Sequence, residues 1–383
     1  MLTVRLPLLR LGSNATRLLV ALDEGVSVAT HPQKIETFVL PQDLIDPDVP
    51  VHTTPQGIEF VRTPDDRFVG LVGYDFTPHY LELDGLRVHY LDEGPSDGPV
   101  VVLVHGQPVW SYLYRTMIPP LVEAGYRVVA WDNIGFGRSD KPIDPAFHTY
   151  LGHVEYYHRI LAALDLTDVT LFCQDWGGVI GLRVVADDPD RFIRVVAANT
   201  GLVENSDLDK GDDGFFPLPQ TAVLGSERRG FLEAAMADDT TSMSFRDSFR
   251  WWIEYCLYSA DLQPGECVFG MGRGQATAEV MAGYNAPFPS YIYSIAPHVF
   301  PSMVPTIGDL NVEAWAALGR FDKPFLYLGG DYDNIGTKAV QRRHVEHIPG
   351  AAGQPHERFP VGHFIQEEIG PVMAARLVAF IES

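Results

Sequence analysis

The stretch Asp168–Gly181, "DVTLFCQDWGGVIG", determines how this chain of 383 residues can fold. Its first half is apolar and β-branched, which is typical of a buried strand, and a helix is expected to follow. Between them, Cys173–Gly178 has the outline of a nucleophile elbow, a sharp turn from strand to helix flanked by small residues. Most hydrolases of this outline have serine at the central position. This chain has Asp175 there, so the turn is expected to carry the chemistry of a carboxylate.

Strands and helices alternate on both sides of this turn. Helical spacing is found at 150–166 and at 179–192. Apolar runs that are expected to be strands include "LRVHYLDEG" at 86–94, "PVVVLVHG" at 99–106, "YRVVAWD" at 126–132, "RVVAANTG" at 194–201 and "KPFLYLGGDYD" at 323–333. Short apolar strands alternating with helices predict an α/β fold with a mostly parallel, doubly wound sheet.

The alternation stops in the middle of the chain, where aromatic residues, Gly and Pro are frequent. We expect this segment to be an inserted, mainly helical cap over the strand ends, where α/β sheets bind ligands. The predicted organisation is an N-terminal extension of unknown role at 1–57, the first part of the sheet domain at 58–203, the cap at 204–305 and the second part of the sheet domain at 306–383.

The composition is that of a water-soluble globular protein, with 46% hydrophobic and 20% charged residues. The net charge of −22 argues against nucleic acid and anionic membranes as partners. The three cysteines, Cys173, Cys256 and Cys267, show no CxxC spacing and are expected to be free thiols in a reducing compartment. No apolar run approaches the roughly 18 residues of a membrane span. These features predict a cytoplasmic protein.

A second motif, "VHGQPVWSYLYR" at 104–115, has the form of an oxyanion-hole loop between a strand and the first helix. Such loops stabilise negative charge with backbone N–H groups. The donors expected here are the N–H of Gln107 and the N–H of Trp176, the residue after the nucleophile. His105 is expected to be structural, because the loop uses backbone donors.

Two further residues complete a possible triad. His363, in "VGHF", follows the elbow and an acid in the order that these hydrolases share. The acid is expected to be Asp333, with Asp331 as its close rival. Each residue also has an ordinary alternative: Asp175 could cap the helix, and the aspartates could merely form a turn. His344 and His347 have the spacing of metal ligands but no evident third ligand, so no metal and no cofactor are expected.

A carboxylate nucleophile suits an electrophilic saturated carbon, where its attack displaces a leaving group and forms an alkyl ester. Haloalkanes and epoxides both qualify as substrates. A departing halide needs N–H donors, which the indoles of Trp176 and of Trp251 or Trp252 could supply, whereas an opening epoxide needs an acidic O–H. Tyrosines in the cap keep the epoxide alternative open: Tyr255, Tyr258, Tyr284, Tyr291 and Tyr293.

The chain from about Val61 onward resembles the haloalkane dehalogenases of the α/β-hydrolase superfamily, in particular the subfamily with two halide-binding tryptophans. The motifs that carry this resemblance are "RTPDDRF", "HYLDEG", "GFGRSDKP", "QDWGG" and "APFP", together with the polar residue after His-Gly in "HGQPVWSYLYR". "QDWGG" alone is less specific, because epoxide hydrolases share "DWGG".

The resemblance implies that Asp175 is the nucleophile, His363 the base and Asp333 the acid. It also implies that Trp176 and Trp252 bind halide, with Trp252 fitting the family pattern better than Trp251. The implied reaction converts a small halogenated alkane and water to a primary alcohol and halide through an alkyl ester on Asp175. A monomer is expected.

The sequence departs from the family pattern in three places. Gln107 stands where the closest relatives are expected to have glutamate, the stretch 226–244 is divergent, and the first 57 residues have no recognised counterpart. Besides epoxide hydrolysis, the remaining alternative is a non-catalytic relative that acts as a receptor or scaffold. An intact triad argues against that alternative.

Overall fold

The computed structural model describes residues 40–204, 245–275 and 277–383. Most of the predicted N-terminal extension and the divergent stretch 226–244 lie outside these residues.

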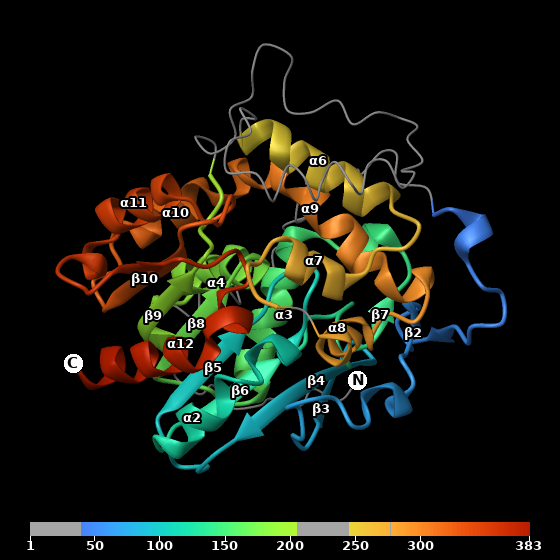
Figure 1. Ribbon diagram of the computed structural model, residues 1–383, viewed down its shortest axis with the longest axis horizontal. Helices are drawn as coiled ribbons and strands as arrows, with labels where there is room; N and C mark the ends of the chain where they lie inside the picture. Colours follow the sequence, from blue (N-terminus) through green and yellow to red (C-terminus); the bar gives the residue numbers. More distant parts are fainter. Residues whose placement is uncertain (1–39, 205–244, 276) are drawn as a thin grey trace, which may run out of the picture. The chain divides into compact units, whose positions relative to one another are not determined.

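An eight-stranded sheet forms the centre of the fold (Figure 1). Its strands, in sheet order, are β11 (Glu357–Phe359), β10 (Phe325–Gly330), β9 (Phe192–Ala198), β8 (Val169–Gln174), β5 (Val100–Val104), β6 (Arg127–Trp131), β4 (Leu86–Glu93) and β3 (His79–Leu83). The run from β11 to β6 is parallel, whereas β4 is antiparallel to both of its neighbours. The mostly parallel sheet predicted from the sequence is therefore confirmed.

The central strands β8 and β5 are apolar almost throughout, because helices leave them no face toward water. Every residue of β8 is buried, and so are the last four residues of β5. Both strands end beside each other at the same edge, since they run parallel and pair directly. This register brings the elbow after β8 next to the loop after β5, which is expected to form the oxyanion hole.

Helices cover the sheet in two packed groups. The helix α2 packs against α12, while α3 packs against α4 and α4 packs against α10. The bounds of these helices and of α11 are α2 (Ile118–Glu123), α3 (Tyr150–Ala163), α4 (Trp176–Asp187), α10 (Val312–Leu318), α11 (Lys338–His347) and α12 (Ile365–Glu382). Thr149 and Thr337 cap α3 and α11 with their side chains, as threonine commonly does at helix starts.

The described part of the insertion contains helices α6 (Phe245–Tyr258), α7 (Pro264–Gly270), α8 (Ala278–Asn285) and α9 (Ile295–Ile307). Helix α6 packs against α9, and α7 packs against α8. In Figure 1, α6 and α9 lie at the top of the view, above α4 and the sheet. These helices lie in the chain between β9 and β10, where the insertion is expected.

A small three-stranded sheet joins the start of the described chain to the core. Its strands are β1 (His52–Thr53), β2 (Glu59–Val61) and β7 (Lys141–Pro142), and both pairings are antiparallel. Arg62, which follows β2, forms two hydrogen bonds of 2.7 and 2.8 Å with the carboxylate of Asp140. This sheet was not predicted, because its strands are too short to show a pattern.

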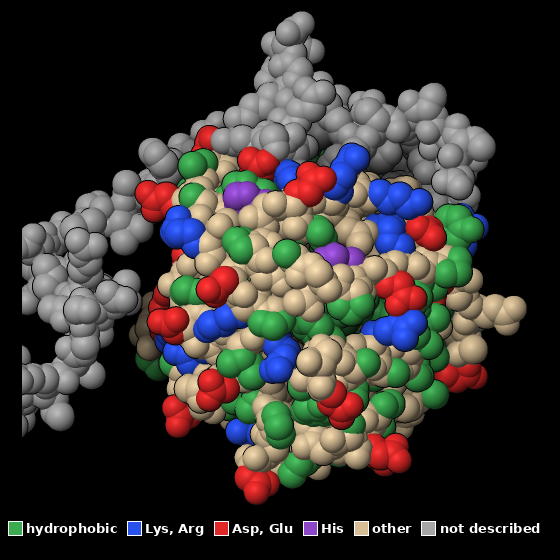
Figure 2. Space-filling view, turned by 90° about the vertical axis from the view of Figure 1, so that its left-hand side faces the viewer, with side chains coloured by type: hydrophobic (Ala, Val, Ile, Leu, Met, Phe, Trp, Pro, Cys, Tyr) green, Lys and Arg blue, Asp and Glu red, His purple; other side chains and the backbone are tan. Residues whose placement is uncertain are grey.

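Figure 2 shows one face of the molecule, on which acidic and basic side chains are scattered among one another. This face therefore does not present the gathered basic surface that nucleic-acid binding requires. Within the described ranges, no helix combines the length and the apolar composition that crossing a membrane would take.

Candidate active site

Asp175 lies in the tight turn between β8 and α4, with φ of 51° and ψ of −128°. A positive φ is uncommon for a residue other than glycine and persists only where the surrounding structure holds it. The carboxylate does not cap the helix. Instead, its Oδ1 accepts a hydrogen bond of 2.7 Å from the backbone N–H of Gln107. The elbow conformation is therefore present, and the alternative of a helix cap is wrong.

The small residues of the motif are needed because backbone segments approach one another closely here. A Cβ atom on Gly177 would lie 2.2 Å from the carbonyl oxygen of Val104. A Cβ atom on Gly106 would lie 2.2 Å from Asp175 Oδ1 itself. Both contacts are far shorter than packed atoms tolerate. The glycines thus allow the loop after β5 to reach the carboxylate.

His363 lies between two carboxylates that are distant from it in the sequence. Its Nε2 is 3.3 Å from Asp175 Oδ2, and its Nδ1 is 2.9 Å from Asp333 Oδ1. All three side chains are buried. The structure thus brings together the three residues that the sequence proposed as a triad, in the order that a nucleophile, a base and an acid require.

Asp331, the rival acid, faces another way. Its Oδ1 lies 3.3 Å from Arg358 Nε and 3.5 Å from Lys338 Nζ, on a partly exposed edge. Asp333 is instead buried and accepts hydrogen bonds of 2.9 and 2.6 Å from the backbone N–H groups of Ile335 and Gly336. These donors hold the carboxylate in the orientation that meets the imidazole.

The two facing carboxylates control the charge of His363. Burial alone would lower the pKa of the imidazole, but the charge of Asp333 and the hydrogen bonds to Asp175 and Asp333 outweigh it and raise the pKa to about 10. The imidazole is therefore protonated at neutral pH. Any reaction that neutralises Asp175 removes its contribution to the raised pKa, so the pKa of His363 falls.

Two residues that sequence reasoning missed fix the loop of His363. The Nδ2 of Asn199 donates to the carbonyls of Gly362 and His363 at 2.9 and 2.8 Å, and its Oδ1 accepts from the N–H of Gly330 at 2.7 Å. Gln174 Nε2 lies 3.1 Å from His363 Nε2 and donates to the His363 carbonyl at 3.3 Å. The available signal was a polar residue at the end of a buried strand: Gln174 is the last residue of β8, and Asn199 directly follows β9.

The two tryptophans predicted to bind halide are both buried, one in the sheet domain and one in the cap. Trp176 is the first residue of α4, and its ring packs edge-on against Phe300 of α9 with 5.1 Å between the ring centroids. Trp252 lies on α6 and stacks on Tyr255. The side chain of Trp251 lies outside the described residues.

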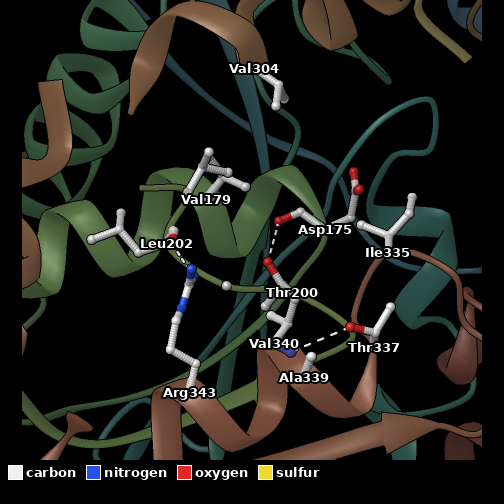
Figure 3. Close-up of a pocket in the computed structure, with 12 residues that line it drawn as sticks. Asp175, Val179, Thr200, Leu202, Val304, Ile335, Thr337, Ala339, Val340 and Arg343 are labelled. Atoms are coloured by element: carbon white, nitrogen blue, oxygen red, sulfur yellow. Dashed lines mark hydrogen bonds between the residues drawn. The ribbon is translucent and has the colours of Figure 1, made fainter. Parts of the chain in front are cut away.

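A pocket of about 250 Å³ adjoins Asp175 (Figure 3). Its lining is largely aliphatic and comes from α4, α9, α11 and the loops after β9 and β10. The residues that line it are Asp175, Val179, Thr200, Gly201, Leu202, Val203, Val304, Ile335, Thr337, Ala339, Val340 and Arg343. Figure 3 shows Arg343 reaching from α11 toward Leu202, away from Asp175. An apolar space beside a carboxylate suits a small apolar electrophile.

The remaining candidates have structural partners. His344 Nε2 accepts from the N–H of Leu202 at 2.9 Å, and His347 Nε2 donates to the Trp315 carbonyl at 2.7 Å. Among the described residues, no group of three acidic, histidine or cysteine side chains could hold a metal ion. Tyr284, one of the cap tyrosines, donates its hydroxyl hydrogen bond to Glu367.

Comparison with known proteins agrees with this geometry. Residues 99–368 match the model of the alpha/beta hydrolase fold family. A haloalkane dehalogenase of Mycobacterium marinum is 44% identical over 333 residues, covering 84% of this chain and 100% of that protein. Haloalkane dehalogenase 1 of Mycobacterium tuberculosis is 45% identical over 334 residues, covering 84% of this chain and 99% of that protein.

A solved structure gives the same picture. The tetrameric haloalkane dehalogenase of Paraglaciecola agarilytica superposes with a TM-score of 0.66 at 29% identity, covering 84% of this chain and 98% of that one. Because full-length relatives above 40% identity and the fold itself agree, the chain belongs to the haloalkane dehalogenases of the α/β-hydrolase fold.

Proposed function

We propose that the protein hydrolyses the carbon–halogen bond of haloalkanes, releasing a primary alcohol and halide through an ester on Asp175. The observation that carries this proposal is the position of the Asp175 carboxylate, with Oδ1 held by the Gln107 N–H and Oδ2 beside His363. Membership of the haloalkane dehalogenase family supports the substrate class.

In the first step, Asp175 Oδ2 attacks the carbon that bears the halogen. A carbon–oxygen bond forms as the carbon–halogen bond breaks, and the electron pair leaves with the halide. A carboxylate is ionised at neutral pH and needs no base for this attack. The indole N–H groups of Trp176 and Trp252 are donors only, so they can hold an anion but cannot protonate an alkoxide.

In the second step, His363 takes a proton from water, and the water oxygen attacks the Cγ of the ester. The negative charge then develops on Oδ1, where the N–H groups of Gln107 and Trp176 stabilise it. The intermediate collapses to the alcohol and the Asp175 carboxylate. Esterification removes the charge of Asp175, so the pKa of His363 falls in the intermediate and the imidazolium releases its proton to the solvent. The neutral imidazole that remains can then act as a base.

Epoxide hydrolysis would use the same triad but is not favoured. It requires a hydroxyl that can protonate the opening epoxide. Tyr284 is committed to Glu367 and also accepts from Arg115 Nη1 at 3.4 Å, which ties α8 to the sheet domain. Dehalogenases are also the relatives that match at more than 40% identity.

A panel of short chloro-, bromo- and iodoalkanes, scored for halide release, tests the function directly. Diol formation from short epoxides is measured in parallel. Halide release without diol formation is expected, whereas turnover of epoxides alone would reject the proposal. The cytoplasmic location and the monomeric state stay predictions, and light scattering tests the second, since the related Paraglaciecola enzyme is tetrameric.

Trp252→Phe is expected to weaken halide binding and slow carbon–halogen cleavage by roughly 10- to 150-fold. Phenylalanine keeps an aromatic ring but removes the N–H, and a hydrogen bond to an anion contributes about 1.5–3 kcal/mol. Quenching of indole fluorescence by chloride, bromide and iodide measures the affinity. Trp251→Phe is the matched control and should have much less effect. Unchanged affinity and cleavage in Trp252→Phe would remove Trp252 from the halide site.

Asp333→Asn is expected to slow hydrolysis of the ester by roughly 10²- to 10⁴-fold and to slow its formation much less. The second step is the one that converts a neutral His363 to the imidazolium, and Asp333 is the carboxylate that stabilises this charge. Rapid-quench kinetics separates the two steps. Asp331→Asn is the control, because Asp331 pairs with Arg358 and Lys338. An equal effect in both variants would show that Asp333 has no specific role.

A further inference from the structure

Gln107 contacts the nucleophile with its main chain and the cap with its side chain. Its N–H donates to Asp175 Oδ1 at 2.7 Å. Its side-chain Nε2 donates to the carbonyl of Pro297 in α9 at 2.7 Å and lies 3.4 Å from the Sγ of Cys256 in α6. The residue is only 2% exposed, so these bonds form out of contact with water.

The Pro297 carbonyl needs a donor from outside its own helix. In an α-helix, each carbonyl accepts from the N–H four residues later. Four residues after Pro297 is Pro301, which has no N–H. A buried backbone acceptor without a partner is costly and rare. Gln107 supplies the missing hydrogen bond from the oxyanion-hole loop.

A second set of contacts fastens α9 at the same place. His298, the residue after Pro297, bonds through Nδ1 to the carbonyl of Cys256, and its ring stacks on Tyr291 with 4.4 Å between centroids. Phe300 of the same helix packs against Trp176. Helix α9 therefore reaches both expected oxyanion donors, Gln107 through its amide and Trp176 through its ring.

We propose that Gln107 is a positioning residue that couples the placement of cap helix α9 to the hydrogen bond on Asp175 Oδ1. When α9 is in place, the amide of Gln107 is held by Pro297, and the backbone N–H of the same residue is held toward the nucleophile. Displacement of α9 releases the side chain and loosens that N–H. The kinetic consequence rests on the proposed function, because Oδ1 carries the developing charge in ester hydrolysis.

This role requires an amide at position 107. Glutamine always offers an N–H to the carbonyl, whereas a carboxylate has only acceptors and a protonated carboxyl offers one O–H. The resemblance leads one to expect glutamate at this position, and such a residue would have to be protonated to make the same contact. Glutamine makes the contact independent of pH.

The test uses Gln107→Met, Pro301→Ala and the double variant, in the full chain. Methionine keeps the unbranched shape and removes the donor. We expect it to lower the rate of ester hydrolysis about 10-fold, because the backbone N–H of residue 107 is then held less firmly toward Asp175 Oδ1, and loss of a whole oxyanion donor costs roughly 10²- to 10³-fold. Pro301→Ala restores an N–H that can serve Pro297 within α9. Because that N–H competes with Gln107 for the carbonyl, Pro301→Ala should itself slow ester hydrolysis. In that background, Gln107→Met should change the rate only about 2-fold, because the hold of Pro297 on the side chain of residue 107 is already weakened.

Gln107→Glu supplies a second readout. Burial, the Pro297 carbonyl and the charge of Asp175 all raise the pKa of a carboxyl at this position. The other ionisable groups around it are His105, Cys256 and His298; burial lowers the pKa of His105, raises that of Cys256 and lowers that of His298 to about 4. The rate of Gln107→Glu relative to the unmodified protein should therefore fall as pH rises, while the relative rate of Gln107→Met stays constant.

Thermal unfolding is measured for the unmodified protein, Gln107→Met, Pro301→Ala and the double variant. These measurements show whether the two substitutions affect the stability of the fold, the rate of ester hydrolysis or both. The proposal is supported if the effects of the two substitutions are not additive, both in the stability to unfolding and in the rate of ester hydrolysis. Coupling in unfolding with identical rates in all four proteins overturns it, since Gln107 would then only stabilise the fold. Additive effects in both measurements also overturn it. If the unmodified protein released no halide, the proposed function would fail while the unfolding cycle still tested the hydrogen bond.

Discussion

Asp175→Ala is expected to abolish halide release, lowering kcat by roughly 10⁴-fold or more, as removal of a covalent nucleophile typically does. The variant loses the only oxygen atoms that can displace the halide in the proposed mechanism. Halide release from a brominated alkane, followed by a halide-sensitive indicator, measures the effect.

The loss must be distinguished from failure to fold. The turn at Asp175 has a positive φ, which alanine tolerates no better than aspartate, so thermal unfolding is measured beside activity. Asp331→Ala is the matched control, since it removes an aspartate on the same side of the sheet that does not face His363. Activity close to that of the unmodified enzyme in Asp175→Ala would reject the mechanism.

His363→Ala is expected to stop the reaction after its first step and to trap the alkyl ester. Asp175 can still attack, because a carboxylate needs no base, but water is no longer activated, which slows hydrolysis of the ester by roughly 10²- to 10⁴-fold. Halide is then released once for each enzyme molecule. Mass spectrometry should show the enzyme heavier by the alkyl group of the substrate.

The position of the adduct is as informative as its presence. Peptide mapping should locate it on the fragment that carries Asp175. An adduct on another carboxylate would contradict the assignment of the nucleophile. Continuous turnover in His363→Ala would show that a different group activates water.

The sequence by itself determined the sheet, the elbow and the order of the triad. These features are local: a strand, a turn and a helix are each specified by the period and the kind of their own residues. The small residues after Asp175 are part of the elbow outline, and the structure shows why they are small, since a Cβ atom on Gly177 would lie 2.2 Å from the carbonyl oxygen of Val104.

Only the tertiary structure decided which carboxylate meets His363. Residues two apart point to the same side of a strand, so the pattern could not separate Asp331 from Asp333. The chain turns after β10, where the N–H of Asp333 bonds to the carbonyl of Gly330 at 3.3 Å, and this turn directs the two side chains apart. Asn199 was missed for a related reason, because its contacts with Gly330 and His363 join strand ends that are far apart in the sequence.

The same distinction applies to the cap. The sequence shows that Pro301 removes a hydrogen bond from a helix, but it does not show which group then donates to the Pro297 carbonyl. The donor that serves Pro297 is Gln107, 190 residues earlier in the chain. Local patterns specify which backbone groups a segment leaves unpaired, and only packing of distant segments specifies which side chain satisfies them.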